Sequence, residues 1–596
     1  MLDTCLTPLE RNGWQVLCML RSAENISPLA NRGQLRRYFA STPLGQRAGS
    51  EGLFTPSRSH CINDRLQDST GIRERTRIMW ILSHCLLRDF LVPQSSPSPS
   101  PSRTPVIVWF RDDQRLADNP ALEHAVATGH PVVCVYVHDP EPLNIRQPGA
   151  AARWWLRESL HALDTALTAL GGKLTVLRGP ERRVIEDFAV EIGANKVFWN
   201  RRYSAMQRET DTAIKSALKE RGISVLTFNG HLLREPWTVA TRDGRPFQIF
   251  SAYWRAARKE YAPEVPRPMP QRVEFYPVPE NVTARVKDLS ALALQPCAPD
   301  WAGGLRETWQ CGEQAGQHQL DLFLASALAR YSSERDIPAM HVTSRLSPYL
   351  RFGNLSVRQV WHAVLLATRT SHCTGNPRTA SIADASVGKF LDELGWREFS
   401  YYLLYHFAPL HQVNFKRQFD AMPWRADARE LRDWQRGETG YPLVDAGMRE
   451  LWRTGWMHNR VRMVAASFLV KHLLIDWREG EAWFWDTLVD ADEASNPANW
   501  QWVAGSGADA APYFRIFNPV LQGQNFDPQG DYVRHWIPEL AGLPGSSIHA
   551  PWHAQPAQLA SASVRLGHDY PLPVVSHQEA RERALKAVEG LREHAR

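Results

Sequence analysis

Five short runs of apolar, largely β-branched residues lie between residues 106 and 228, and stretches of helical periodicity separate them. The runs span residues 106–110, 131–137, 173–177, 196–199 and 223–228. Strands that alternate with helices need crossover connections, which place neighbouring strands in parallel and cover both faces of the sheet with helices. The pattern therefore predicts an α/β domain with a parallel sheet over residues 103–235.

The chain changes character beyond this region. Residues 236–315 contain a proline-rich stretch with few periodic runs, which predicts a long connector between domains. From residue 316 onward no strand pattern remains, and long amphipathic stretches dominate, for example at residues 388–406 and 457–475. This part of the sequence predicts an all-helical domain over residues 316–590.

Residues 1–102 differ from everything that follows. They contain arginine but no lysine, show no sustained hydrophobic period, and end in a low-complexity Ser-Pro run. Such a composition is typical of a disordered segment. We expect the segment to be disordered, or to lie upstream of the true start, for which Met79 is a candidate. An Arg-rich targeting sequence is the competing interpretation.

Composition excludes several classes of protein. The eight cysteines form no CxxC pair and no metal-ligand spacing, so we expect no metal site and a reducing, cytosolic environment. No apolar run reaches the roughly 18 residues that a membrane span needs, so we expect no membrane association. A net charge of +6 is compatible with a polyanionic partner. The 23 tryptophans pack a core, stack on a ligand or carry electrons, and composition does not decide between these roles.

Two predicted helices of the C-terminal domain carry polar residues beside large apolar ones. Glu393, Trp396 and Arg397 share one helix face, at spacings of three and four residues. The second helix carries a comparable set on one face, namely Asn459, Arg462 and Met463. Each set alone is compatible with a buried ion pair in a core. Together they are typical of pocket walls that combine an apolar body with a few fixed polar groups.

Two further segments hold groups suited to a ligand. Asp490 and Asp492 stand close together, without the His or Cys that would favour a metal site. Carboxylates that face a ligand's hydroxyl or ring N–H groups, or that pair with Arg462, are the preferred interpretation. Residues 343–347 combine hydroxyls, backbone N–H groups and an arginine, which suits a diphosphate. For these five residues alone, a helix cap before Pro348 is the simpler explanation.

From Pro105 to about residue 590, the sequence resembles the photolyase and cryptochrome family. The resemblance rests on residues 331–335, 343–347, 393–399, 439–445, 455–460, 490–502 and 509–518. It implies a nucleotide-binding-like, Rossmann-type α/β domain followed by a large helical domain that binds FAD. The sequence is most similar to bacterial class I cyclobutane pyrimidine dimer photolyases. That similarity implies light-driven repair of damaged single- or double-stranded DNA, by electron transfer from excited reduced FAD to a flipped-out dimer.

The matching motifs imply a set of FAD-binding positions. They are Tyr331, Thr343, Ser344, Arg345, Leu346, Ser347, Arg462, Asp490, Ala491, Asp492 and Asn496. Residues 343–347 would hold the phosphates. Arg462 would pair with Asp490 beside the isoalloxazine ring, and Asn496 would face the N5 edge of that ring.

The resemblance also implies the positions that contact DNA and the lesion. They are Arg335, Glu393, Trp396, Arg397, Asn459, Arg460, Met463, Trp502 and Gln522. The two tryptophans would flank the nonplanar dimer, while Glu393 and Asn459 would hydrogen-bond its pyrimidine edges. Glu393 is also the implied catalytic residue, because a protonated carboxyl group would stabilise the electron added to the dimer. Arginines at the rim would bind phosphates without regard to base sequence.

Three tryptophans, Trp500, Trp477 and Trp424, match the family's electron-transfer chain between the flavin and the surface. Such a chain would reduce an oxidised flavin after light absorption. Core packing is the alternative role for each residue taken alone. Their joint match favours electron transfer.

Three positions favour dimer repair over other activities of the family. Enzymes for the six-four photoproduct carry histidine at the positions of Asn459 and Met463, where the two imidazoles serve proton transfer. Asn496 matches bacterial photolyases, whereas plant-type cryptochromes tend to have an aspartate there, which can protonate flavin N5. Repair is therefore the preferred function. A cryptochrome-type blue-light photoreceptor is the alternative.

The identity of a second, light-harvesting chromophore stays open. The family's folate-binding pattern falls on Met206, Gln207, His411 and Gln412, and all four residues differ from it. Methenyltetrahydrofolate, a deazaflavin, a second flavin and no antenna at all are the alternatives. We also expect a monomer that is cytoplasmic, in the bacterial cytosol, and associated with the nucleoid.

Overall fold

The computed structural model describes residues 104–594, except 143–144, 260–261, 284, 297, 373–376, 408 and 510–513. These residues belong to one compact unit, Arg103–Arg596. The expectations for residues 1–102 lie outside the described residues. Among the helices that the structure describes, none has the length and apolar character needed to cross a membrane.

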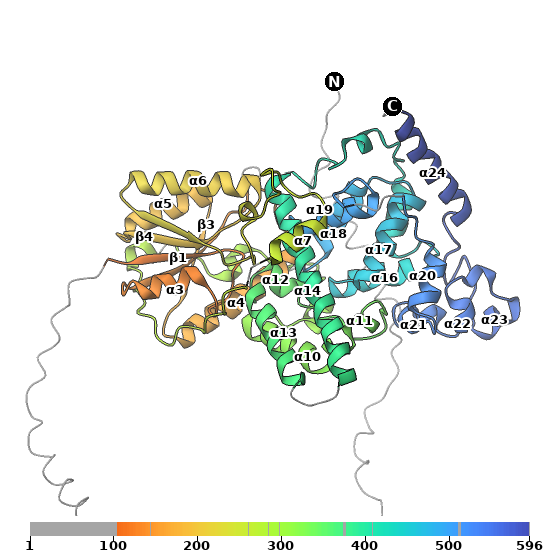
Figure 1. Ribbon diagram of the computed structural model, residues 1–596, viewed down its shortest axis with the longest axis horizontal. Helices are drawn as coiled ribbons and strands as arrows, with labels where there is room; N and C mark the ends of the chain where they lie inside the picture. The colour runs from red at the N-terminus through yellow and green to blue at the C-terminus, as the bar shows by residue number, and fades with distance from the viewer. Residues whose placement is uncertain are drawn as a thin grey trace, which may run out of the picture. The chain divides into compact units, whose positions relative to one another are not determined.

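A five-stranded parallel sheet with the order β3-β2-β1-β4-β5 forms the first part of the fold (Figure 1). The strands are β1 Val106–Phe110, β2 Val132–His138, β3 Leu174–Arg178, β4 Lys196–Asn200 and β5 Ser224–Phe228, and the intervening helices are α3 Pro120–Ala127, α4 Ala150–Ala169, α5 Glu181–Glu191 and α6 Ala205–Glu220. The predicted α/β fold is confirmed.

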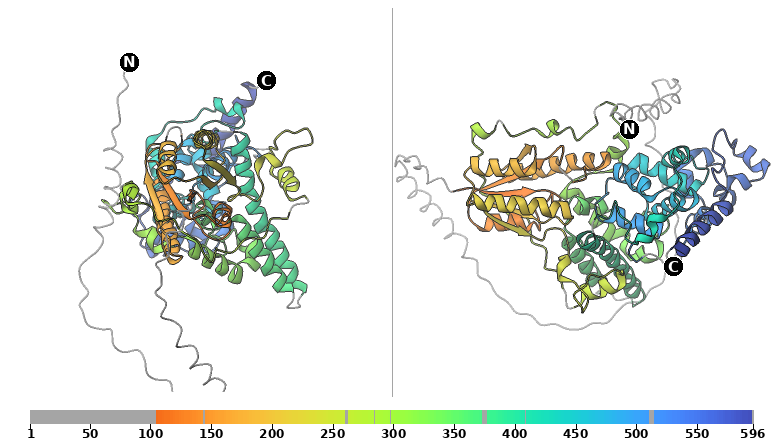
Figure 2. Two further views of the ribbon diagram at one scale, coloured as in Figure 1. Left: turned by 90° about the vertical axis from the view of Figure 1, so that its left-hand side faces the viewer. Right: turned by 90° about the horizontal axis from the view of Figure 1, so that it is seen from above.

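Side-chain alternation along β1 explains why helices cover both faces of the sheet. Val108 and Phe110 pack in one core with residues of α3 and α4. Ile107 and Trp109 point to the opposite face and pack in another core with residues of α5 and α6. Figures 1 and 2 show the sheet between these two helix layers. Because both faces are buried, the strands read as continuous apolar runs in the sequence.

All regular elements that the structure describes beyond β5 are helices, so the prediction of a helical region is confirmed. The α-helices are α7 Phe250–Arg258, α8 Glu280–Thr283, α9 Gly303–Thr308, α10 Glu313–Ser326, α11 Tyr331–Glu334, α12 Ser347–Arg351, α13 Val357–His372, α14 Pro377–His406, α15 Ala428–Arg436, α16 Pro442–Thr454, α17 Asn459–Ser467, α18 Trp477–Thr487, α19 Ser495–Ala504, α20 Pro519–Phe526, α21 Asp531–Trp536, α22 Gly545–Ile548, α23 Pro556–Ser561 and α24 His577–His594. Short 3-10 helices are η1 Pro236–Thr238, η2 Leu289–Leu292, η3 Leu328–Arg330, η4 Arg417–Ala421, η6 Pro538–Leu540 and η7 Pro551–His553, and a π-helix, η5, spans Phe468–His472.

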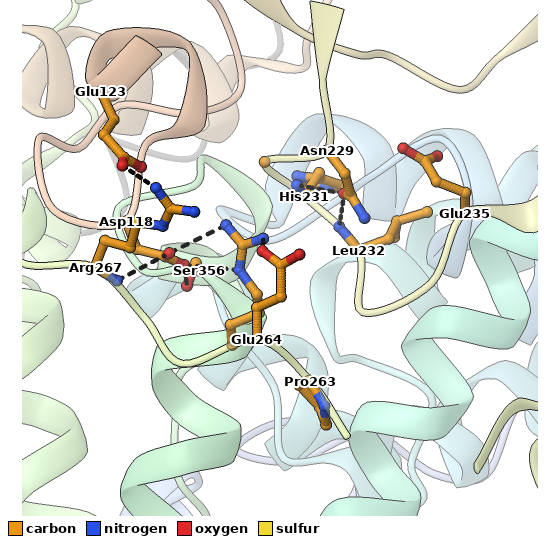
Figure 3. Close-up of polar contacts among 12 residues, drawn as sticks. Asp118, Glu123, Asn229, His231, Leu232, Glu235, Pro263, Glu264, Arg267 and Ser356 are labelled. Carbon is orange, nitrogen blue, oxygen red and sulfur yellow. Dashed lines mark hydrogen bonds and ion pairs between the residues drawn. The ribbon is translucent and has the colours of Figure 1, made fainter. Parts of the chain in front are cut away.

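Asp118, in the loop after β1, ties the proline-rich connector to both parts of the fold (Figure 3). Its buried carboxylate accepts two hydrogen bonds from Arg358 of α13, both at 3.1 Å, and one from the Ser356 hydroxyl. Its backbone N–H donates to the carbonyl oxygen of Arg267 at 2.9 Å, and the Arg267 N–H donates back to the carboxylate at 3.3 Å. The connector is therefore held to the sheet and to the helices by one anion.

Replacing this anion should destabilise the fold. Asp118→Ala leaves the guanidinium of Arg358, whose side chain is 11% exposed, without its buried partner. We expect the free energy of unfolding to fall by about 3 kcal/mol in a urea titration. The matched control is Asp243→Ala, because Asp243 pairs with Arg245 on the exposed surface, and it should change stability by less than about 0.5 kcal/mol. Equal effects of the two substitutions would contradict this assignment.

Candidate functional site

A charge pair between Arg462 and Asp490 forms the polar centre of the helical region. The two Nη atoms of Arg462, on α17, donate to the two carboxylate oxygens of Asp490 at 3.1 and 2.8 Å. The Asp490 side chain is only 4% exposed. The hydroxyl of Ser347, at the start of α12, donates to the same carboxylate at 2.6 Å. Three segments far apart in the sequence therefore meet at one carboxylate, as the pairing predicted from sequence requires.

Arg345, in the loop before α12, presents a half-buried cation close to this pair. Its backbone adopts a left-handed conformation, with φ of 52°. Its guanidinium lies over the rings of Trp309 and Trp456, at 4.5 and 4.9 Å from their centroids. Burial lowers the pKa of Arg345, and its Nε has no hydrogen-bond partner among the residues that the structure describes. A half-buried arginine with an unpaired Nε donor fits an anionic ligand such as a diphosphate.

The other loop residues predicted for the cofactor site lie around this cation and the central pair. The backbone carbonyl oxygen of Ser344 accepts a hydrogen bond from the Gln319 amide at 2.9 Å. Leu346 is 1% exposed. The carbonyl oxygen of Ala491 accepts from Nε of Arg351 at 3.0 Å. These contacts fix the backbone on both sides of the Arg462–Asp490 pair, whereas Thr343 is only half-buried.

Asp492 and Asn496 hold the start of α19 in place. The carboxylate of Asp492 accepts from the backbone N–H of Ala494 at 2.8 Å and also from that of Ser495. The amide nitrogen of Asn496 donates to the backbone carbonyl and to the side chain of Glu481, at 3.1 and 2.8 Å. Both side chains are buried, so their polar groups are set before any ligand binds.

Tyr331 occupies a different environment from the other predicted cofactor residues. Its ring is 6% exposed and packs edge-on against Phe323 and Phe390, with centroids 5.7 and 5.4 Å away. The guanidinium of Arg335 lies over it, 5.2 Å from the centroid. The ring therefore contacts Arg335, one of the charged groups described next.

A chain of alternating charges surrounds Glu393 on α14. Its carboxylate pairs with Arg335, and with Lys389 at 3.3 Å. Arg335 also lies 3.8 Å from Asp336, which accepts a hydrogen bond from Arg460 at 2.8 Å. The structure therefore brings together three residues predicted for lesion or DNA contact. Lys389 and Asp336 were not predicted, although their signals are visible in the sequence: a lysine four residues before the glutamate and a carboxylate next to the arginine.

Most of the remaining predicted lesion residues are less buried than the predicted cofactor residues at the start of α19. Asn459 is exposed at the first position of α17, and Met463, one turn later, is half-buried. Trp396 on α14 and Trp502 on α19 are also half-buried. Gln522 on α20 has a buried side-chain oxygen with no hydrogen-bond partner within the described part of the chain. These groups retain surface and polar atoms with which to contact a ligand.

Arg397 lies elsewhere. Its guanidinium donates to the carbonyl oxygen of His231 at 3.0 Å and contacts Nε2 of the same histidine at 2.7 Å. Burial and the Arg397 charge hold the pKa of His231 well below its usual range, so the neutral ring accepts. With 11% of its side chain exposed, Arg397 is committed to an internal contact with the loop after β5. The structure does not place it at the rim with Arg335 and Arg460.

The three predicted electron-transfer tryptophans differ in depth. Trp500 is 3% exposed and packs edge-on against Phe484, with centroids 4.9 Å apart. Trp477 is fully buried, and its indole N–H donates to Asn414 at 2.9 Å. Trp424 is half-buried and packs against the same apolar cluster that contains the other two. The burial order is consistent with a chain whose outer member is Trp424.

A buried polar cluster behind the central pair was not predicted. Glu450 of α16 accepts from the hydroxyl of Tyr532 at 2.6 Å and from the backbone N–H of His458 at 3.1 Å. Burial raises the pKa of Glu450 to about 7 and lowers the pKa of His458 to about 4. The cluster joins α16, α17 and α21 beneath the residues that face a ligand. Tyr532 lies 82 residues after Glu450, so no sequence spacing reveals the cluster.

A cavity opens at the carboxyl ends of β1 and β4. In the strand order β3-β2-β1-β4-β5, these are the two neighbours between which the direction of the chain's crossovers reverses. Asp112, Arg202, Tyr401 and Glu493 are among its lining residues. Such a switch point is a common ligand site in parallel α/β sheets. Gln207, one of the four antenna positions, also lines it and donates to Glu493 at 3.4 Å.

The other three antenna positions do not line this cavity. Met206 is 37% exposed on α6. His411 and Gln412 lie in the loop after α14, where the Gln412 amide nitrogen is 3.2 Å from Nε2 of His411. The four residues therefore share no single enclosed site.

Comparison with known proteins agrees with this architecture. The family model for the FAD binding domain of DNA photolyase matches residues 390–590, and the model for DNA photolyase matches residues 106–271. The deoxyribodipyrimidine photo-lyase of Agrobacterium fabrum is 48% identical over 485 residues, which cover 81% of this chain and 97% of that protein. Cryptochrome-1 of Arabidopsis thaliana is 39% identical over 485 residues, covering 81% of this chain and 70% of that protein.

A solved structure gives the same result. The crystal structure of a bacterial class III photolyase from Agrobacterium tumefaciens matches with a TM-score of 0.78 and 47% identity, covering 84% of this chain and 100% of its own. The prediction of an FAD-binding helical region is therefore confirmed. The narrower expectation of class I is not supported, because this similar structure belongs to class III.

The central charge pair generates a prediction about the cofactor. Asp490→Asn keeps the shape of the side chain but removes the charge that pairs with Arg462. We expect FAD affinity to fall by roughly tenfold or more, measured from the visible flavin absorbance of the purified protein and by titration. Asp476→Asn is the control, because Asp476 pairs with Arg478 in a more exposed position. Full flavin retention in Asp490→Asn would contradict the assignment.

Proposed function

Because this chain belongs to the DNA photolyase and cryptochrome family, we propose that it repairs cyclobutane pyrimidine dimers in damaged DNA by light-driven electron transfer. The observation that carries the proposal is the position of Glu393. Its carboxylate lies among cations on a helix that also presents Trp396, and the relative with 48% identity is a deoxyribodipyrimidine photo-lyase.

The cofactor would supply the electron, and the protein would bind and orient the cofactor. FAD, when bound and reduced, supplies the light-excited electron. The chain's own groups bind and orient it: Arg345 offers its open Nε to the phosphates, and the Arg462–Asp490 pair offers polar atoms to the ring system. Asn496 is held by Glu481, so its side-chain oxygen keeps one direction. An amide at this position offers no acidic proton to the flavin.

Lesion recognition follows from the groups around Glu393. Trp396 and Trp502 would flank the nonplanar dimer, and Glu393 and Asn459 would hydrogen-bond its edges. A normal base would leave these groups poorly paired, which gives discrimination. A dimer stacks and pairs weakly in the duplex, so its extrusion costs less than that of an intact base.

Contacts with the DNA backbone would add affinity for DNA without a preference for base sequence. Arg335 and Arg460 lie on the charged chain around Glu393, and the side-chain amide nitrogen of Gln522 is a further group that would donate to a phosphate. Arg397 is not assigned a DNA contact, because its guanidinium is bound to His231. Phosphate contacts of this kind weaken steeply as salt concentration rises.

Trp500, Trp477 and Trp424 would carry an electron inward to restore the reduced flavin. The fixed indole of Trp477, bonded to Asn414, supports a defined path. The outermost member, Trp424, is the one with access to an external reductant.

A blue-light photoreceptor is the second candidate function, and the 39% identity to a plant cryptochrome favours it. The higher identity to a photolyase and the amide at Asn496 favour repair. We further propose that residues 103–235, 236–315 and 316–590 act as antenna domain, connector and catalytic domain of a cytoplasmic, nucleoid-associated monomer.

The direct test uses the purified protein with its flavin reduced and an oligonucleotide that carries one thymine dimer. Repair predicts that blue light restores intact thymines and that a dark sample keeps the dimer. A photoreceptor predicts no loss of the dimer in either sample. An absorption spectrum of the same preparation identifies the flavin and any antenna.

Glu393→Ala separates repair from cofactor binding. We expect repair to slow by roughly 10- to 100-fold, because a group that hydrogen-bonds the dimer is lost, while the flavin content stays unchanged. The rate of dimer loss per absorbed photon gives the measurement. Glu334→Ala, which removes a surface partner of Arg330, is the matched control and should repair normally.

Trp477→Phe tests the electron-transfer assignment. We expect light-driven reduction of the oxidised flavin to be largely lost, because the middle of the chain is removed, while repair by chemically reduced protein continues. Flavin absorbance during illumination measures the first effect. Trp485→Phe alters another buried tryptophan of α18 and should leave photoreduction intact. Normal photoreduction in Trp477→Phe would exclude this route.

A further inference from the structure

Three aromatic rings stand nearly parallel where α7 meets α14. The ring of Phe250 on α7 stacks on that of Trp396 on α14, with centroids 3.7 Å apart and planes 11° from parallel. The ring of Trp254, one turn further along α7, is also nearly parallel to that of Phe250, with centroids 6.3 Å apart and planes 18° from parallel. Ring faces at 3.7 Å are in van der Waals contact, so Phe250 restricts the plane of the Trp396 indole.

Gly395 explains how α7 comes this close to α14. A Cβ atom at this position would lie 2.6 Å from Cε2 of Trp254. Glycine destabilises a helix interior, so its presence in the middle of α14 calls for a packing reason, and Trp254 supplies it. The indole N–H of Trp254 also donates to Asp392 at 2.9 Å. Packing and a hydrogen bond therefore fix α7 against the turn that carries Glu393 and Trp396.

The first residue of α7 is tied to the loop that follows α19. The backbone N–H of Phe250 donates to the carboxylate of Asp509 at 3.3 Å, while Ile249, the residue before α7, makes no side-chain cap. Asp509 follows α19, the helix of Trp502. Its backbone is left-handed, with φ of 50°, and burial raises its pKa. Helix α7 thus links the two tryptophans assigned to the lesion walls.

We propose that α7 braces the lesion pocket and that Phe250 is the positioning residue that holds Trp396 in the plane that receives the dimer. The inference rests on the proposed function, since it assumes that Trp396 contacts the lesion. Phe250 acts only through Trp396. A wall whose orientation is set before DNA arrives loses less conformational freedom on binding, which raises affinity for the dimer.

The test measures binding in the dark, with flavin-loaded protein and oligonucleotides with and without one thymine dimer. We expect Phe250→Leu to weaken binding of the dimer oligonucleotide by roughly 3- to 10-fold, the worth of one aromatic contact, and to leave binding of undamaged DNA unchanged. Phe250→Tyr keeps the ring and should restore most of the affinity. Phe228→Leu, which removes a half-buried ring from β5, is the matched control and should bind like the parent protein.

A second variant changes the packing of α7 on α14 by a substitution in α14. Gly395→Ala should push Trp254 and α7 outward and weaken dimer binding in the same direction as Phe250→Leu. The flavin absorbance of each variant shows whether the site is otherwise intact. If Phe250→Leu loses its flavin, Phe250→Tyr and Gly395→Ala decide the question.

Two results would overturn the brace: dimer affinity in Phe250→Leu equal to that of Phe228→Leu, or unchanged dimer affinity in Gly395→Ala. Dark binding does not depend on repair. A parent protein that binds dimers in the dark but does not split them in light would refute the proposed function, and the variants would still test the brace. A parent protein that does not distinguish dimer DNA from undamaged DNA would overturn both.

Discussion

The pair between Arg462 and Asp490 is the interaction on which the rest of the site depends. It joins α17 to the loop after α18, and Ser347 adds the start of α12 to the same carboxylate. A paired charge at this depth is costly to break, because either partner left alone would be a poorly solvated ion. The chain therefore holds three distant segments in one arrangement and offers a ligand polar atoms whose directions are already set.

The charged groups around Glu393 differ from the central pair, because they balance one another and are only partly buried. Arg335 and Arg460 each have a carboxylate partner before DNA binds. A phosphate would exchange places with such a partner, so each contact adds less affinity than a free cation would give. In the proposed function, discrimination then falls to the groups that would meet the lesion: two tryptophans, a carboxylate and an amide. Such an arrangement suits an enzyme that must leave undamaged DNA quickly and retain a dimer.

The sequence predicted the parallel sheet because strands buried on both faces read as unbroken apolar runs, and it predicted the helical region from its periodicity. It also led to the pairing of Arg462 with Asp490 through the resemblance of whole motifs. It did not reveal Glu450 with Tyr532, the internal contact of Arg397, or the stacking of Phe250 on Trp396. Those contacts join residues that are 82, 166 and 146 positions apart, and only the packing of helices decides them. Gly395 was visible in its motif, but the need for a glycine there comes from the close approach of the Trp254 ring on α7.

The most direct measurement is the fluorescence lifetime of the reduced flavin in the intact protein, with and without a dimer-bearing oligonucleotide. If the excited flavin passes an electron to a dimer held beside Glu393 and Trp396, the lifetime shortens when dimer DNA binds and stays the same with undamaged DNA. An unchanged lifetime at saturating dimer DNA would show that no electron leaves for the lesion, and would contradict the account.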